Sequence, residues 1–175
     1  MLCLPYSTLG KEGLHLSSYM GLSKSLDNQL SVHLEDQADH VFKAQWDNKS
    51  FTDSHWWAGR ADYWTGDTLY GFELIHHKIY LKNVTSTIQN FSISDGYNLV
   101  YFNIGKQIGK HIFRFGTGVV FAHPDMQIAG RDRYITKGTK GHKLAGPTIQ
   151  FNYERWIWEN ISNYISLDSK LTFSY

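Results

Sequence analysis

The segment from Ile165 to Tyr175 alternates apolar and polar residues, and this pattern constrains the fold more than any other feature of the chain. Its apolar positions are Ile165, Leu167, Leu171, Phe173 and Tyr175, and the alternation breaks only at Ser169. A period of two indicates a β-strand with one apolar face. Strands of soluble sheets usually hold about five or six residues, whereas membrane-crossing strands hold about nine to eleven. The segment therefore predicts a strand of membrane-crossing length.

Further segments predict six more strands. They span residues 14–23, 56–65, 69–81, 94–104, 113–121 and 149–154. Within 113–121, Gly116 and Gly118 share one face, and small residues on that face suit a narrow interior. Aromatic residues make up 15% of the chain and only 3 residues are proline. This composition is typical of many strands bordered by aromatic belts.

The predicted connections alternate between long and tight. Long ones occupy 24–55, 82–93 and 123–142, and tight ones lie at 66–68, within 105–111 and near Glu159. Outer-membrane barrels have short periplasmic turns and longer outer loops, whereas a soluble β-sandwich, the alternative fold, has no reason for such alternation. We therefore expect an all-β protein, a small antiparallel up-and-down β-barrel of the bacterial outer membrane. The barrel domain would span 14–175, after an N-terminal segment 1–13.

The number of strands bears on the ends of the chain. Seven strands would leave an open edge in lipid, so we expect about eight, with the last one beyond Tyr175. Alternatively, Tyr175 is the true C-terminus, because a terminal aromatic after alternating apolar residues resembles the signal used by the barrel-assembly machinery. Met1 to Gly10 lacks the basic and apolar regions of a secretory signal. Either the signal has been removed or the sequence is a fragment.

Composition excludes several classes of protein. Lys and Arg total 17 against 16 Asp and Glu, and no basic block is interleaved with aromatics, so nucleic-acid binding is not supported. No apolar run reaches the roughly 18 residues of a membrane-spanning helix. The single cysteine, Cys3, cannot form an internal disulfide. Phosphate-loop, paired-cysteine and G-x-S-x-G motifs are all missing from the sequence.

Charged and aromatic residues at particular strand positions predict two structural features. By strand parity, six charged residues face inward and should pair with one another inside a narrow barrel: Arg60, Asp62, Arg114, Glu154, Asp168 and Lys170. Aromatic residues at strand ends should form interfacial belts: Trp56, Trp57, Trp64, Tyr80, Trp156 and Trp158.

Polar residues gather at the outer end of the expected barrel. They are His76, His77, Lys78, Asp95, His123, Asp125 and His142. Adjacent strand residues point to opposite faces, so only one of His76 and His77 can face the interior without a bulge. We favour His76 with Lys78, which requires a bulge near Ile75 or a position at the rim. These groups suit either a metal or acid/base cluster, or contacts with lipid phosphates and water.

Several stretches resemble one family. They are Trp46 to Phe51 (WDNKSF), Ala58 to Trp64 (AGRADYW), Gly71 to Tyr80 (GFELIHHKIY), Ser94 to Asn98 (SDGYN), Ala122 to Asp125 (AHPD) and Leu144 to Gln150 (LAGPTIQ). In this order they resemble the outer-membrane barrels known as lipid A oxidases, which convert the proximal glucosamine of lipid A to an aminogluconate. The chain departs from the family pattern at Asn48 (usually Gly), Glu73 (usually Asp) and Ile75 (usually Asn), and in the His-Pro order at 123 and 124.

The gathering of polar residues at the outer end predicts a site, and the resemblance implies its function. The expected catalytic residues are His76, Lys78, Asp95 and His123, and the expected substrate-binding residues are Arg60, Glu73, Asn98, Asp125 and His142. His76, Asp95 and His123 would hold a divalent metal ion, since sugar oxidation needs an electron acceptor. The partners would be lipid A or lipopolysaccharide and membrane lipids. A non-enzymatic envelope or surface-recognition barrel and a lipid A acyl hydrolase are the alternatives.

Overall fold

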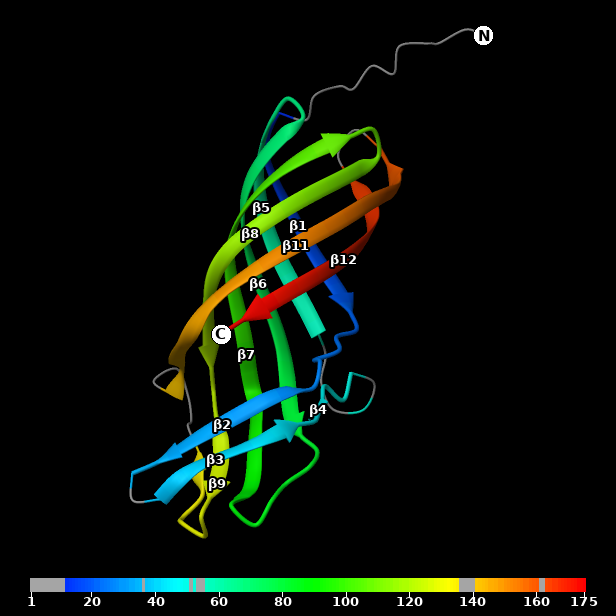
Figure 1. The fold of residues 1–175 in the computed structure, drawn as a ribbon. Helices are drawn as coiled ribbons and strands as arrows, with labels where there is room; N and C mark the ends of the chain where they lie inside the picture. Colours follow the sequence, from blue (N-terminus) through cyan, green and yellow to red (C-terminus); the bar gives the residue numbers. More distant parts are fainter. Residues whose placement is uncertain (1–11, 36, 51, 53–55, 136–140, 161–162) are drawn as a thin grey trace, which may run out of the picture.

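A seven-stranded antiparallel path dominates the fold (Figure 1). The computed structural model describes residues 12–35, 37–50, 52, 56–135, 141–160 and 163–175. The path runs through β1 (Gly13–Gly21), β5 (Trp56–Thr65), β6 (Thr68–Leu81), β7 (Ile88–Ile108), β8 (His111–Ala122), β11 (Lys143–Glu159) and β12 (Tyr164–Ser174). The all-β antiparallel class and the seven predicted strands are confirmed, and β7 and β11 are several residues longer than expected. In the described part of the chain no sheet closes into a barrel, since β1 pairs only with β5 and β12 only with β11.

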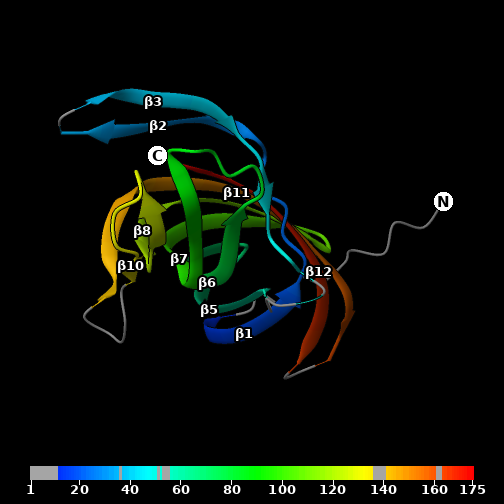
Figure 2. The same ribbon diagram turned by 90° about the horizontal axis from the view of Figure 1, so that it is seen from below.

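The sheet curls so far that its first and last strands come into side-chain contact. Figure 2, a view along the long direction of the molecule, shows the strands curving around a common interior. Across this interior the Tyr164 hydroxyl of β12 donates to Ser17 Oγ of β1 at 2.8 Å. The Lys170 ammonium of β12 lies 5.3 Å from the centre of the Tyr19 ring of β1. The concave side is therefore an enclosed interior even though the backbone edges stay apart.

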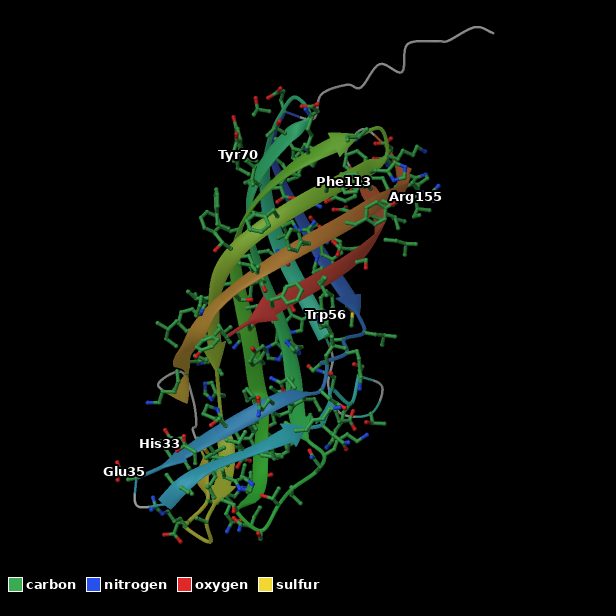
Figure 3. All side chains as sticks on the ribbon, in the orientation of Figure 1. His33, Glu35, Trp56, Tyr70, Phe113 and Arg155 are labelled. Atoms are coloured by element: carbon green, nitrogen blue, oxygen red, sulfur yellow. The ribbon has the colours of Figure 1, made fainter. Side chains whose placement is uncertain are left out.

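The convex outer face is apolar on each of the seven strands. Alternate residues of every strand are exposed, and the large apolar ones include Leu16 at 74%, Phe72 at 65% and Leu167 at 68%. Tyr70 and Phe113, near the end with short turns in Figure 3, belong to the same face. Water-soluble monomers rarely expose a contiguous apolar surface of this extent. The outer face therefore carries the composition that a soluble protein keeps inside.

The concave inner face carries a charged network between two apolar clusters. Toward the short turns lies one cluster of Trp64, Leu69, Ile112 and Trp156. Toward the opposite end lies the other, formed by Ala58, Ile75, Leu99, Tyr101 and Val120. The expected interfacial position is wrong for Trp64 and Trp156, because both rings are buried in the interior with centres 6.0 Å apart.

The predicted inward charges form this network and are confirmed as a group. The Arg60 guanidinium contacts Glu73 at 3.0 Å, Glu154 at 2.9 Å and Asp168 at 2.8 Å. The remaining ion pairs join Arg114 to Asp62 and Glu154, and Lys170 to Glu73 and Asp168. These bonds link strands that are far apart in the sequence.

Inner-face glycines leave the space that the network occupies. A Cβ on Gly71 would lie 2.0 Å from Asp62 Oδ1, and one on Gly116 would lie 2.2 Å from Asn103 Oδ1. Both distances are far below van der Waals contact, so any side chain at either position would displace a buried polar group. The small residues predicted for the interior thus leave room for long polar side chains.

The long connections, which we expected to be loops, contain further strands. β2 (Asn28–Leu34) and β3 (Gln37–Ala44) form a separate hairpin, while β4 (Trp46–Asp47) pairs with β6. β9 (Asp125–Ile128) pairs with β10 (Tyr134–Ile135) and with the start of β7. The expectation was wrong because these segments bury their own apolar residues around Ala44, Trp46, Leu81 and Ile88. Figure 3 shows His33 and Glu35 at the far tip of the β2–β3 hairpin.

No helix within the described ranges is long and apolar enough to cross a membrane.

Candidate functional site

Four polar side chains form a continuous row of hydrogen bonds at the end of the sheet that carries the long connections. His76 Nδ1 lies 2.7 Å from Asn98 Oδ1, and Asn98 Nδ2 lies 3.2 Å from His142 Nε2. His142 Nδ1 in turn lies 2.6 Å from His123 Nε2. We call this row of His76, Asn98, His142 and His123 the His–Asn string. It spans β6, β7, the residue after β8 and the residue before β11.

Strand register explains why residues distant in the sequence meet here. His76 pairs with Asn98, Asn98 with Phe121, and Lys143 with Ala122. His123 and His142, which follow and precede the last pair, therefore face each other across the ends of their strands. Because His76 and Asn98 share their side of the sheet with Phe121, the string begins on the outer, apolar face.

A single glycine makes the close approach possible. Gly96 has a φ of 128°, a conformation that side chains rarely adopt. A Cβ at this position would lie 2.8 Å from Asn98 Nδ2 and 3.0 Å from His76 Cε1. The Gly96 carbonyl also accepts a hydrogen bond from the His123 backbone N–H at 3.2 Å. Gly96 thus positions three members of the string.

The hydrogen bonds assign a direction to the string. Because Asn98 Oδ1 can only accept, neutral His76 carries its proton on Nδ1 and leaves Nε2 as a proton acceptor. Asn98 Nδ2 can only donate, so His142 accepts through Nε2 and donates from Nδ1 to His123. This assignment follows from the bonding pattern and the orientation of the Asn98 amide. The string can therefore offer a basic nitrogen at the His76 end.

An aromatic side chain stacks against the His76 end. The Trp57 ring lies 5.3 Å from the His76 ring at an interplanar angle of 18°, and Trp57 is 40% exposed. We expected Trp57 only as a belt residue and did not connect it with the site. Its position directly across from His76 in the β5–β6 register is the signal that would have connected them.

His76 lies on the outer face of the sheet, whereas the preferred prediction needed a bulge near Ile75 to turn it toward the interior. Pairing between β5 and β6 is continuous through His76, so the expected bulge near Ile75 is wrong, and the register shift lies between His77 and Ile79. His76 is half-buried on the outer face, which agrees with the rim alternative. His77 instead points inward, buried, with its ring 4.9 Å from that of Tyr97.

The other predicted site residues lie apart from the string. Arg60 and Glu73 have fully buried side chains in the charged network, so they face the opposite side of the sheet. Asp125 accepts hydrogen bonds from Asn90 Nδ2 at 3.1 Å and from Arg133 Nε at 2.7 Å. Its hydrogen bonding to Arg133 and its negative charge raise the pKa of the Arg133 guanidinium. The Lys78 carbonyl accepts from Asn48 Nδ2 at 3.0 Å.

The expected metal set is His76, Asp95 and His123. The side chain of Asp95 lies outside the described residues. Among the side chains that are described, no group of three His, Cys, Asp or Glu residues could hold a metal ion. The facing nitrogens of His123 and His142 are joined to each other by a hydrogen bond of 2.6 Å.

No family model, curated protein or solved structure matches the chain. The resemblance to lipid A oxidases therefore stays a prediction.

Proposed function

We propose that this chain is a β-barrel protein of the bacterial outer membrane that acts on lipid A at the His–Asn string. The observation that carries the proposal is the reversed polarity of the curled sheet. Large apolar side chains are exposed on all seven strands, while Arg60, Glu73 and Glu154 are buried inside. An outward apolar band around a polar interior is the pattern of outer-membrane barrels.

The two open edges support closure by one more strand. β1 and β12 are the first and seventh strands of an antiparallel path, so they run in the same direction. One strand inserted between them would pair antiparallel with both. The resulting eight strands form a barrel whose interior is just filled by side chains, which agrees with the packed inner face.

The position of the string suggests its ligand. Short turns join β5 to β6, β7 to β8 and β11 to β12, whereas the string lies at the end with the long connections. Outer-membrane barrels carry their long loops on the outside of the cell. The string would then lie at headgroup level in the outer leaflet, facing the phosphorylated glucosamines of lipid A.

The proposed chemistry is oxidation of a proximal glucosamine whose C1 carries no phosphate, so that its ring can open. The hydrate of the C1 aldehyde would lose two electrons and two protons to form the carboxylic acid, and dioxygen would accept them to form hydrogen peroxide. His76 Nε2 would take up the hydroxyl proton as a general base.

Mass spectrometry of lipid A tests this function. Cells with the intact gene should show lipid A that is heavier by one oxygen atom, and His76→Ala should abolish the gain. His111→Ala is a matched control, because His111 also lies on the outer face but beside Tyr153 at the short-turn end. An unchanged lipid A mass in all strains would contradict oxidation, and loss of an acyl chain would indicate a hydrolase.

The hairpins at the long-connection end favour a second candidate function. β2–β3 and β9–β10 add structured surface around the cluster of Ala44, Trp46, Leu81 and Ile88. A non-enzymatic barrel that recognises partners through these hairpins would leave lipid A unmodified. Deleting 29–43 would then abolish partner binding without any change in the lipid A spectrum.

A further inference from the structure

A shallow apolar groove of about 350 Å³ runs along the outer face of β5, beside the His–Asn string. Its lining side chains are those of Trp57, Ala61, Phe72, Leu74 and Val100, with Gly59 in the floor. The adjoining Arg60 and Glu73 have no exposed side-chain surface, so only their backbone contributes. The groove surface is therefore almost entirely apolar.

The groove exists because two successive outward positions of β5 have almost no side chain. Gly59 pairs with Leu74, and Ala61 pairs with Phe72, so bulky residues of β6 stand beside a low floor. A Cβ placed on Gly59 would meet no atom within 4 Å. The depression is thus open to an occupant from the surroundings and is not filled by the protein itself.

The groove has a polar end and a length that suit an amphiphile. Trp57, stacked on His76, marks the end at the string, and Ala61 is the last lining residue along β5. Four residue steps at about 3.3 Å each give about 13 Å of strand. At a tilt of about 45° this is about 9 Å of depth, the part of one leaflet nearest the headgroups in a hydrocarbon core of about 30 Å.

We infer that this groove seats one acyl chain of a lipid A molecule whose headgroup contacts the His–Asn string. The inference rests on the proposed function for the identity of the headgroup. The part of a linear acyl chain nearest its headgroup matches an apolar groove that starts beside the string and runs about 9 Å toward the middle of the bilayer. The lining offers no charged group to a peptide or to a second copy of the chain.

Photolabelling of the full chain in vesicles tests the groove. The probe is lipid A with a diazirine near the middle of one acyl chain, and labelled peptides are identified by mass spectrometry. Labels should concentrate on β5 and β6. Gly59→Phe fills the floor and should lower this labelling about tenfold, equivalent to about 1.4 kcal/mol. Thr117→Phe, at an exposed outer position of β8, should leave it unchanged.

A second variant and a second probe distinguish the ways in which the inference could fail. If Gly59→Phe does not insert, Ala61→Leu narrows the same floor and should show a smaller loss. Labels spread evenly over all strands, or labelling insensitive to both variants, would overturn the inference. Equal labelling by a phospholipid with the same chain would overturn the assignment to lipid A. Gly59-sensitive labelling without any oxygen gain in lipid A would contradict only the proposed oxidation.

Discussion

The inner and outer faces of the seven-stranded sheet are built from alternate residues of the same strands, yet they need opposite surroundings. On β6, Glu73 is buried and paired with Arg60, while its neighbours Phe72 and Leu74 are exposed. The inner face holds its charges by mutual neutralisation across strands. The outer face presents large apolar side chains that have no such compensation within the protein. The comparison shows that burial in this chain does not follow hydrophobicity, and four substitutions test it.

The largest effect is expected inside, from Arg60→Ala. Removing this guanidinium leaves Glu73, Glu154 and Asp168 without their shared partner, and breaking a buried ion pair typically costs about 3–5 kcal/mol. The loss in free energy of unfolding is measured in detergent, with heat-modifiable mobility on a gel as the signal for unfolding. Arg155→Ala is the control, because Arg155 is exposed at the short-turn end (Figure 3). Equal effects of the two substitutions would contradict the network's structural role.

The second-largest loss of stability is expected from a charge introduced on the outer face. Phe102→Lys places an ammonium in the middle of the apolar band, where Phe102 is 45% exposed. In a bilayer this should cost about 2–4 kcal/mol and reduce insertion into vesicles. Gln89→Lys, an exposed change away from the band, should have little effect. If the Phe102→Lys variant is instead soluble without detergent and as stable as the unchanged protein, the outer face is exposed to water and the membrane proposal fails.

Overpacking of the interior should lower the stability by somewhat less than the two preceding substitutions. Gly116→Ala brings a methyl group against Asn103 and Gln150, and overpacking typically destabilises by about 1–3 kcal/mol. Gly59→Ala is the matched control on the outer face, where the new methyl meets no atom within 4 Å. The difference between the two midpoints of thermal unfolding is the measurement. A Gly59→Ala variant as unstable as Gly116→Ala would refute the close packing described for the inner face.

The smallest effect on stability is expected at the string. Asn98→Ala removes two hydrogen bonds on the partly exposed outer face, which together are worth about 1 kcal/mol at the lower end of the usual range. Binding of lipid A should suffer more than folding, because His76 and His142 lose their shared orienting partner. Comparing the thermal midpoint with lipid A retention in native mass spectrometry distinguishes the two. A large stability loss with normal retention would make the string a structural feature.

Much of the fold could be predicted because alternation is a local property. Phe113 and Phe115 alternate with Arg114 and Gly116 whatever the rest of the chain does, so strand and face were predicted together. The hairpin of β2 and β3 was missed although Leu30, Val32 and Leu34 alternate in the same way. The segment was treated as one long loop, and only its packing on Trp46 and Ile88 shows that it forms a sheet.

The candidate site was predictable in membership but not in arrangement. His76, His123 and His142 were expected at the outer end of the barrel, and Asn98 was expected as a substrate-binding residue; strand order brings the four together. His76 lies on the outer face because the alternation of β6 continues through it, and the register shift comes only after His77. The positive φ of Gly96 and the stacking of Trp57 likewise depend on how neighbouring strands align.

The sequence by itself determined which residues share a face, because successive side chains of any extended strand point to opposite sides. Only the tertiary structure decided which face is concave and which residues meet across it. Arg60 and Asp168 pair at 2.8 Å although 108 positions separate them, and His76 meets Asn98 and then His142 in one row. Curvature, register and strand order arise from contacts between all seven strands together, so no single segment can encode them.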